Sequence, residues 1–526
     1  MSAPREERQE KQQETGPAQP GRDERAEGAF TRSRVIGLIA GPLVGLIIYL
    51  LMPDMPLPLA EGEDEAVLSA NGRTVAAVTA FIAIWWATEA IPIPVTSLLP
   101  LVLFPVMLEG TPIGDVSSSY GSDTIFLFMG GFMLALAMQK WNLHKRIALT
   151  IVSKVGSNSA GLIGGFMLAT GFITMWVSNT ATAVMMLPVG LSVVTVLTQF
   201  RKGRTDANFA TALMLGIAYA SSIGSVATII GTPPNVLMVG YLSEAHDITI
   251  GFGQWMLAGV PLAAVFLFLA WFVLIKVFPP EAKRVEGAQE LIRTELTGLG
   301  AMSRGEKGVS LVFALAALSW IFIPVLARSE GIGSALPWLA GISDAGIAMT
   351  VAVVLFLVPI DRQGTRLLDW ETAVGLPWGV LLLFGGGLAI SGQFTASGLS
   401  TWIGGQVSVL AGIPLWVLIL VVTALVLFLT ELTSNTATAA TFLPILGGVA
   451  LGMGMDVMTL VVPVALAATM AFMLPVATPP NAIVFGSGYV RIGQMIRGGL
   501  WLNLIALVLI LGAMYGLFSW AIGITL

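Results

Sequence analysis

The sequence SNTATAVMMLP at residues 178–188 returns as SNTATAATFLP at residues 434–444, with 8 of 11 positions identical. Each copy is followed by a second shared motif, GTPPN at 231–235 and ATPPN at 477–481. Ser, Asn and Thr favour helix ends because their side chains compete for backbone hydrogen bonds. Proline interrupts a helix because it lacks an N–H group. The chain therefore carries two matched pairs of predicted helix breaks.

A third pair of motifs shows that these copies belong to a long repeat. FMGG at 128–131 matches FGGG at 384–387. The offset between copies is 256 residues for the FMGG and SNT pairs and 246 residues for the TPPN pair. Nearly constant spacing over three motifs indicates one large unit that is used twice.

The composition is that of a membrane protein. The 526 residues are 56% hydrophobic and only 11% charged, and the mean hydropathy is +0.85, whereas soluble domains carry about 25% charged residues. The absence of cysteine excludes disulfides and cysteine-ligated metals. We therefore expect an all-α, polytopic protein that crosses the lipid bilayer of the inner (plasma) membrane many times.

Apolar runs of roughly 20 residues, the length that spans a bilayer, predict about 11 transmembrane helices. They fall near 35–53, 74–92, 95–109, 124–139, 207–229, 253–279, 308–328, 344–360, 376–394, 458–486 and 498–525. Two further stretches, about 160–188 and 412–446, are each interrupted by an SNT motif. We interpret them as re-entrant hairpins that enter and leave on the same side and turn at the SNT break.

The distribution of Lys and Arg supports this topology. If the N-terminal tail is cytoplasmic and the hairpins do not cross, 24 of the 26 Lys and Arg residues lie inside, and only Arg73 and Arg328 lie outside. Cytoplasmic loops of membrane proteins carry this excess of positive charge. The pattern predicts a cytoplasmic N-terminus and an extracytoplasmic C-terminus.

After the first span, each unit holds five crossings and one hairpin. Because five is odd, the second unit starts on the opposite face, which gives two inverted-topology repeats, the arrangement of many secondary transporters. The predicted organisation begins with a disordered cytoplasmic tail at 1–33 and a first transmembrane helix at 34–53. Repeat 1 follows at 74–280, with its broken helix at 231–235. A cytoplasmic linker at 281–307 leads to repeat 2 at 308–526, with its broken helix at 477–481.

Two segments outside the spans are predicted to act as arms between moving parts. The segment from Gln139 to Val155 mixes basic and apolar residues like a helix that lies on a membrane surface. Its positional counterpart near 395–406 carries no charge. The prediction that both link moving parts rests on their position alone.

The SNT breaks carry the chemistry of a cation site. Thr174 and Ser178 are spaced i, i+4, as are Thr430 and Ser434, so each pair of hydroxyls lies on one helix face near its end. The last carbonyl groups of a helix have no partner within it. Hydroxyl, amide and carbonyl oxygens together predict a neutral cage that suits Na⁺.

The TPPN breaks add further oxygens to these cages. Proline removes backbone hydrogen bonds, which frees upstream carbonyl groups such as those of Gly231 and Ala477. One cage per repeat predicts two bound Na⁺ ions.

The second half of each hairpin begins at the break and points its N-terminus towards the centre, where free N–H groups favour an anion. No Lys or Arg occurs in these motifs, so the charge that compensates the anion must come from bound cations. This reasoning predicts cation-coupled anion uptake. The neutral donors for the anion are Asn179, Thr180, Asn435, Thr436, Thr232 and Thr478.

Two carboxylates fall within apolar segments, Glu89 in WWATEAIP and Glu431 in TELTSNT. An ionisable residue inside a membrane is by default a candidate functional residue. We favour a structural role, in which the carboxylate caps or orients a hairpin, over direct proton coupling.

At these motifs the chain resembles the divalent anion/sodium symporter family, the INDY-type di- and tricarboxylate transporters. The resemblance rests on WWATEAIP at 85–92, the two SNT motifs, GTPPN at 231–235 and LPVATPPNAIVFGSG at 474–488. It extends from the first span to the C-terminus. It implies an elevator transporter, a homodimer in which a transport domain carries the site across the membrane past a fixed scaffold domain.

The resemblance also implies residue sets for the two cations and the substrate. The first Na⁺ site would comprise Thr174, Ser178, Asn179 and Gly231, and the second would comprise Thr430, Ser434, Asn435 and Ala477. Substrate would contact Asn179, Thr180, Asn435 and Thr436, together with Thr232 and Thr478.

The function that we favour is Na⁺-coupled symport of C4-dicarboxylates such as succinate, malate and fumarate. The family also contains sodium-independent exchangers and sulfate carriers, so exchange, citrate and sulfate remain open as alternatives. An anion channel is disfavoured because two hairpins that meet at a midplane site suit alternating access. We expect neither enzymatic activity nor a nucleic-acid partner.

Overall fold

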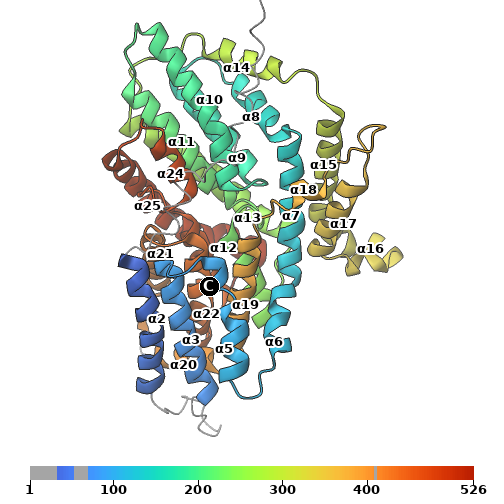
Figure 1. Cartoon of the computed structure of the whole chain (residues 1–526), viewed down its shortest axis with the longest axis vertical. Coiled ribbons are helices and arrows are strands. Elements are labelled where there is room, and N and C mark those ends of the chain that lie inside the picture. The colour runs from blue at the N-terminus through green and yellow to red at the C-terminus, as the bar shows by residue number, and fades with distance from the viewer. Residues whose placement is uncertain (1–31, 53–68, 408–411) are drawn as a thin grey trace, which may run out of the picture.

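The computed structural model describes residues 32–52, 69–407 and 412–526 of the chain, and in this part it consists of helices joined by turns and loops, with no strand beyond two isolated bridges. The all-α prediction is confirmed (Figure 1). The predicted tail lies outside the described residues except for Arg32 and Ser33, which begin the first described helix.

Within the described ranges, nine helices are long and apolar enough to cross a membrane. Five further apolar helices are shorter, at 10–17 residues. The chain is therefore a multi-pass membrane protein. The total of about 11 transmembrane helices stays a prediction, because two of the nine long helices follow the SNT motifs and several predicted spans are divided into shorter helices.

The N-terminal part packs its first two helices closely. Helix α2 (Arg32–Leu51) lies along α3 (Ala70–Thr88), and the buried glycines of α2 face α3. Small residues let two helix backbones approach in a membrane. The helices that follow are α4 (Ile93–Thr96), α5 (Leu99–Met107), α6 (Ile113–Ser118) and α7 (Asp123–Lys140).

Both SNT motifs separate two helices. The first lies between α9 (Ser159–Thr174) and α10 (Asn179–Phe200), and the second between α21 (Leu415–Thr430) and α22 (Asn435–Gly452). At the first break the Ser178 hydroxyl accepts a hydrogen bond from the N–H of Ala181 at 3.3 Å. This N-cap satisfies one donor at the start of α10 and explains why a helix begins there.

Both TPPN motifs also separate helices. Helix α11 (Ala207–Ser225) is followed by α12 (Pro233–His246), and α23 (Met458–Thr469) by α24 (Pro479–Gly486). All residues of α23 are buried, as are all those of α11 from Phe209 onward. The broken helices therefore occupy the centre of the described fold.

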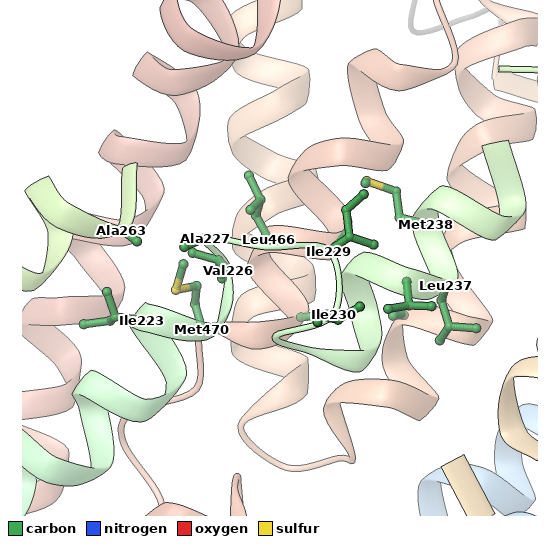
Figure 2. Packing of buried hydrophobic residues seen from close by; sticks show 14 of the residues in the cluster. Ile223, Val226, Ala227, Ile229, Ile230, Leu237, Met238, Ala263, Leu466 and Met470 are labelled. Atoms are coloured by element: carbon green, nitrogen blue, oxygen red, sulfur yellow. The ribbon is translucent and has the colours of Figure 1, made fainter. Parts of the chain in front are cut away.

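Apolar side chains hold the first central break in place. Figure 2 shows Val226, Ala227 and Ile229 on the non-helical segment after α11, close to Leu466 and Met470 of the other broken region. These side chains are fully buried. Burial of apolar surface from both halves of the sequence therefore compensates for the helical hydrogen bonds that the break removes.

The remaining α-helices are distributed around this centre. They are α8 (Leu143–Ser153), α13 (Phe252–Val277), α14 (Ala288–Gly298), α15 (Arg304–Ala327), α16 (Ile332–Ala335), α17 (Asp344–Leu357), α18 (Trp370–Ala373), α19 (Trp378–Ala396), α20 (Leu399–Val407), α25 (Ile492–Ala513) and α26 (Ser519–Ile522). In Figure 1, α10, α11 and α14 lie towards one end of the long axis, whereas α5, α6 and α20 lie towards the other.

The two predicted arm segments form helices that are anchored in different ways. On α8, Arg146 Nε lies 2.6 Å from Glu306 Oε1 of α15, and Lys145 Nζ lies 3.3 Å from Glu295 Oε2 of α14. Helix α20 instead packs against α22, where Gly404 and Gly452 bring the two backbones together. Charge therefore anchors the first arm, whereas small residues anchor the second.

Candidate functional site

A central cavity with a volume of about 980 Å³ lies where the four breaks meet. Ten of the twelve predicted site residues line it: Ser178, Asn179, Thr180, Gly231, Thr232, Ser434, Asn435, Thr436, Ala477 and Thr478. The other two, Thr174 and Thr430, are fully buried and hydrogen-bond to residues that line the cavity. The structure therefore brings the whole predicted set together.

Four helices begin at this cavity. The first residues of α10, α12, α22 and α24 all line it. Each helix N-terminus presents the positive end of its dipole, but free N–H groups are offered mainly by α10 and α22, because α12 and α24 each begin with two prolines, which have no N–H. At two of the four ends, Thr232 and Ser434 occupy the N-cap without a side-chain cap hydrogen bond. The cavity is therefore electropositive without any charged side chain from the motifs.

The first SNT break places three oxygens around one hydroxyl hydrogen. Thr174 Oγ1 lies 2.8 Å from Asn179 Oδ1 and 3.0 Å from the carbonyl oxygen of Ser221. The hydroxyl has one hydrogen, so it can donate to only one of these two acceptors. A cluster with more oxygens than hydrogens is a suitable environment for a hard cation.

The second SNT break repeats this geometry. Thr430 Oγ1 lies 2.8 Å from Asn435 Oδ1 and 3.0 Å from the carbonyl oxygen of Ala468. The two clusters share the same Thr and Asn side chains, a backbone carbonyl oxygen and the same distances, although they belong to different halves of the chain. Na⁺ fits both, because its ligands are hydroxyl and carbonyl oxygens.

Two residues that stabilise the breaks were not singled out by the sequence analysis, although both end a TPPN motif. Asn235 Nδ2 donates to the carbonyl oxygen of Thr228 at 3.0 Å, and Asn481 Nδ2 donates to that of Leu474 at 3.0 Å. Each amide therefore stabilises the non-helical segment before its helix. Among the described residues, neither buried amide oxygen has a hydrogen-bond partner. The repeated Asn after Pro-Pro was the available signal.

Glu431 is buried at the second break and is fully hydrogen-bonded. Its carboxylate accepts hydrogen bonds from the backbone N–H groups of Phe472, Met473 and Leu474 at 2.8–3.2 Å, and from Asn503 Nδ2 at 2.8 Å. Hydrogen bonds from N–H donors to a carboxylate are stronger than those between neutral groups. Glu431 therefore caps the segment between α23 and α24, rather than the hairpin itself.

The second hairpin and the second broken helix have different surroundings from their counterparts in the first half of the chain. Leu432 and Val476 line the cavity and are 70% and 79% exposed. Their counterparts by the repeat offsets are Trp176 and Ile230. Trp176 packs edge-on against Phe313 with 4.7 Å between ring centroids, and Ile230 is only 7% exposed. The site is therefore open beside the second hairpin and covered beside the first.

The rest of the cavity wall comes from helices outside the two motif pairs. Residues from the start of α2, the end of α3, one face of α7 and the start of α19 face the four breaks. Glu89 and Arg34 lie in this wall, away from the SNT motifs. The two carboxylates singled out from the sequence are therefore in different environments, since Glu431 is buried and Glu89 faces open space.

The sequence matches the family described as "Sodium:sulfate symporter transmembrane region" over residues 38–524. It is 43% identical over 504 residues to the sodium-dependent dicarboxylate transporter SdcS of Staphylococcus saprophyticus, covering 94% of this chain and 93% of that protein. It is 42% identical over 502 residues to SdcS of Staphylococcus aureus strain USA300, with the same coverage.

Solved structures with low sequence identity share the fold. The YdaH transporter of Alcanivorax borkumensis matches with a TM-score of 0.58 and 15% identity, covering 94% of this chain and 100% of that one. MtrF of Neisseria gonorrhoeae matches with a TM-score of 0.56 and 13% identity, covering 91% and 93%. The extent of the family match and the 43% identity to a curated relative show that this chain belongs to the sodium:sulfate symporter family of membrane transporters.

Proposed function

We propose that this protein is a Na⁺-coupled symporter of C4-dicarboxylates such as succinate, malate and fumarate. The observation that carries the proposal is the meeting of four helix N-termini and two oxygen clusters at one cavity. The helix ends favour an anion, and the clusters favour small hard cations. The curated relatives are named sodium-dependent dicarboxylate transporters, which agrees with this chemistry.

The two Na⁺ ions would bind at the equivalent clusters, giving a stoichiometry of two or more. The first site comprises Thr174, Ser178, Asn179 and Gly231, and the second comprises Thr430, Ser434, Asn435 and Ala477. The carbonyl oxygens of Ser221 and Ala468 add one ligand to each, because they already lie 3.0 Å from the threonine hydroxyls. The positive charge held there offsets the negative charge of the substrate.

The substrate would bind between the two clusters. Its carboxylates would accept hydrogen bonds from N–H groups at the starts of α10 and α22 and from neutral side chains of the motifs, while α12 and α24 would contribute their helix dipoles. Those side chains are Asn179, Thr180, Asn435, Thr436, Thr232 and Thr478. Because no basic side chain from the motifs shares the site, cation binding and substrate binding are coupled through charge.

Transport would proceed by an elevator mechanism between two inverted repeats. The different surroundings of the two broken helices support this proposal, since Val476, beside the second TPPN break, is exposed where its counterpart Ile230 is covered. A shift that exchanges these surroundings would close the cavity on one side and open it on the other. The hairpins and broken helices would form the moving domain, and the protein would act as a homodimer.

The cavity would open to the cytoplasm in the described state. Its rim includes Arg34 at the start of α2 and Gly375 near the start of α19. Both lie close in sequence to basic residues, which the charge distribution assigns to the inside. We therefore propose a cytoplasmic N-terminus, an extracytoplasmic C-terminus and residence in the plasma membrane.

Uptake of radiolabelled succinate into proteoliposomes, with and without an inward Na⁺ gradient at equal osmolarity, tests the proposal. We expect saturable uptake that requires the gradient. Uptake indifferent to Na⁺ but stimulated by internal dicarboxylate would identify an exchanger instead. Competition by unlabelled sulfate and citrate establishes whether either is a preferred substrate.

A further inference from the structure

The cavity rim carries an ion pair that the proposed Na⁺ and substrate sites do not use. Among the described residues that line the cavity, Arg34 and Glu89 are the only charged ones. Arg34 Nη2 lies 3.9 Å from Glu89 Oε2, and the side chains are 26% and 57% exposed. A long, solvated pair of this kind is weak, because water competes for both charges.

Several local preferences oppose a carboxylate at Glu89. Its backbone is left-handed, with φ 47° and ψ 42°, a conformation that residues with long side chains rarely adopt. It also caps the C-terminus of α3, the negative end of the helix dipole. Its side chain faces a cavity that we propose to hold an anion. Backbone strain that persists in this way is concentrated at functional sites.

Close packing between α2 and α3 fixes the two side chains relative to each other. Gly37 lies one turn after Arg34, and a Cβ atom there would lie 2.0 Å from Thr88 Oγ1, next to Glu89. Gly41 is equally close to Trp85, where a Cβ would lie 2.5 Å from the indole ring. Arg34 lies in the first turn of α2 and Glu89 directly follows the last residue of α3, so the packing of these two helices positions the backbones of both residues.

We propose that Arg34 is an auxiliary anion-binding residue at the cavity mouth and that Glu89 tunes it by competition. A dicarboxylate that enters or leaves through the mouth exchanges one of its carboxylates for that of Glu89 on the Arg34 guanidinium, which binds carboxylates through paired N–H donors. This inference rests on the proposed function, from which it takes its ligand. It affects only the membrane face on which the cavity opens in the described state.

Transport kinetics measured separately at the two faces test this subsite. Half-saturating succinate concentrations are measured in inside-out and right-side-out membrane vesicles for the wild type, R34Q and E89Q. At the cytoplasmic face, R34Q raises the value and E89Q lowers it, each by roughly threefold, the scale of an exposed ion pair. The value at the external face stays unchanged in both variants. High ionic strength reduces both shifts, because it screens exposed charges.

Two further variants separate direct competition from a general charge effect. R32Q removes a positive charge from the same helix turn at a residue that does not line the cavity. It leaves the half-saturating succinate concentrations at both membrane faces unchanged. In the double variant R34Q/E89Q, the effect of E89Q disappears, because competition requires Arg34. An E89Q shift that persists without Arg34, or equal shifts at both faces, would overturn the subsite.

The same experiment keeps this inference distinct from the proposed function. Wild-type vesicles without Na⁺-driven succinate uptake would reject the proposed function itself. Normal wild-type uptake, combined with R34Q and E89Q constants equal to those of the wild type at the cytoplasmic face, would reject only the subsite.

Discussion

At the scale of single residues, the candidate site is built from hydroxyl and amide groups that have few hydrogen-bond partners to choose from. Thr174 and Thr430 are fully buried, and each lies within 3.0 Å of two carbonyl-type oxygens. Without a cation, one of these two oxygens has no hydrogen to accept from the threonine. A bound Na⁺ would satisfy all three oxygens at once, so this geometry supports the proposed cation sites more strongly than the SNT motif does alone.

Removing the Thr430 hydroxyl tests the second cation site. Thr430→Val keeps the volume but deletes one proposed ligand, so we expect the Na⁺ concentration for half-maximal uptake to rise roughly 10- to 100-fold. Thr423→Val on the same helix is the matched control, since Thr423 Oγ1 bonds only to the carbonyl oxygen of Ile419 in its own helix. An equal rise of the half-maximal Na⁺ concentration in Thr430→Val and Thr423→Val would argue against the site.

Asn435 is expected to be essential for transport. We propose it for both the second cation site and the substrate site, so we expect Asn435→Ala to abolish Na⁺-driven succinate uptake while the protein still inserts into the membrane. Asn208→Ala serves as the control, because Asn208 makes an exposed hydrogen bond to Pro279 far from the cavity. Wild-type uptake by Asn435→Ala would remove the second hairpin from the site.

At the scale of elements, the fold is built from helix breaks that side chains stabilise. Asn235 and Asn481 hold the two central breaks, and Glu431 adds several N–H···O bonds at the second. The first break lacks a carboxylate, because Met175 stands at the position of Glu431. There the Thr228 hydroxyl donates to the Met175 carbonyl oxygen at 2.6 Å. Equivalent breaks are thus stabilised by different groups.

Glu431→Gln is expected to weaken the second break. The amide NH₂ group would face buried N–H donors, and each donor left without an acceptor costs roughly 1–3 kcal/mol. We expect a lower midpoint of thermal unfolding in detergent. Added Na⁺ should also raise this midpoint less than it does in the wild type. Glu109→Gln, at an exposed residue, should leave both unchanged. A Glu431→Gln protein as stable as the wild type would show that the cap is dispensable.

The packing of α20 against α22 leads to a second prediction at this scale. A Cβ at Gly404 would lie 2.2 Å from Gly452 Cα, a backbone atom that cannot rotate away. Gly404→Ala should therefore reduce both stability and transport. Gly392→Ala, in helix α19 with no atom within 4 Å of the added Cβ, should be neutral or slightly stabilising, because alanine favours helices more than glycine does. Thermal unfolding and uptake measured on both variants check this contrast.

At the scale of the whole molecule, the two halves share motifs but not environments. Val476 and Leu432 are exposed in the cavity, whereas Ile230 and Trp176 are packed. A symmetric sequence in an asymmetric state is expected of a protein that alternates between two such states.

Single cysteines can test this asymmetry directly, since the chain has no cysteine of its own. We expect Val476→Cys to react quickly with a membrane-impermeant thiol reagent in inside-out vesicles, and Ile230→Cys to react slowly there. Na⁺ with succinate should slow the labelling of Val476→Cys, because both occupy the cavity. Equal labelling of the two cysteines from that face would contradict the proposed alternation.

The sequence alone determined the membrane class, the helical architecture and the breaks, because these depend on local properties. Composition decides whether a chain can remain in lipid, and Ser-Asn-Thr and Pro-Pro interrupt helices wherever they occur. The match between the two copies of each motif was enough to nominate all twelve site residues. The structure then placed ten of them on the cavity and two directly behind it.

Only the tertiary structure decided which distant groups complete the site. The carbonyl oxygens of Ser221 and Ala468 lie 47 and 38 residues from the threonines that they face, and no spacing rule connects them. The contact between Arg34 and Glu89 likewise depends on how α2 packs against α3. The exposure of Leu432 and Val476 and the covering of Trp176 and Ile230 belong to the packing of the whole chain, since all four residues flank motifs that both halves share.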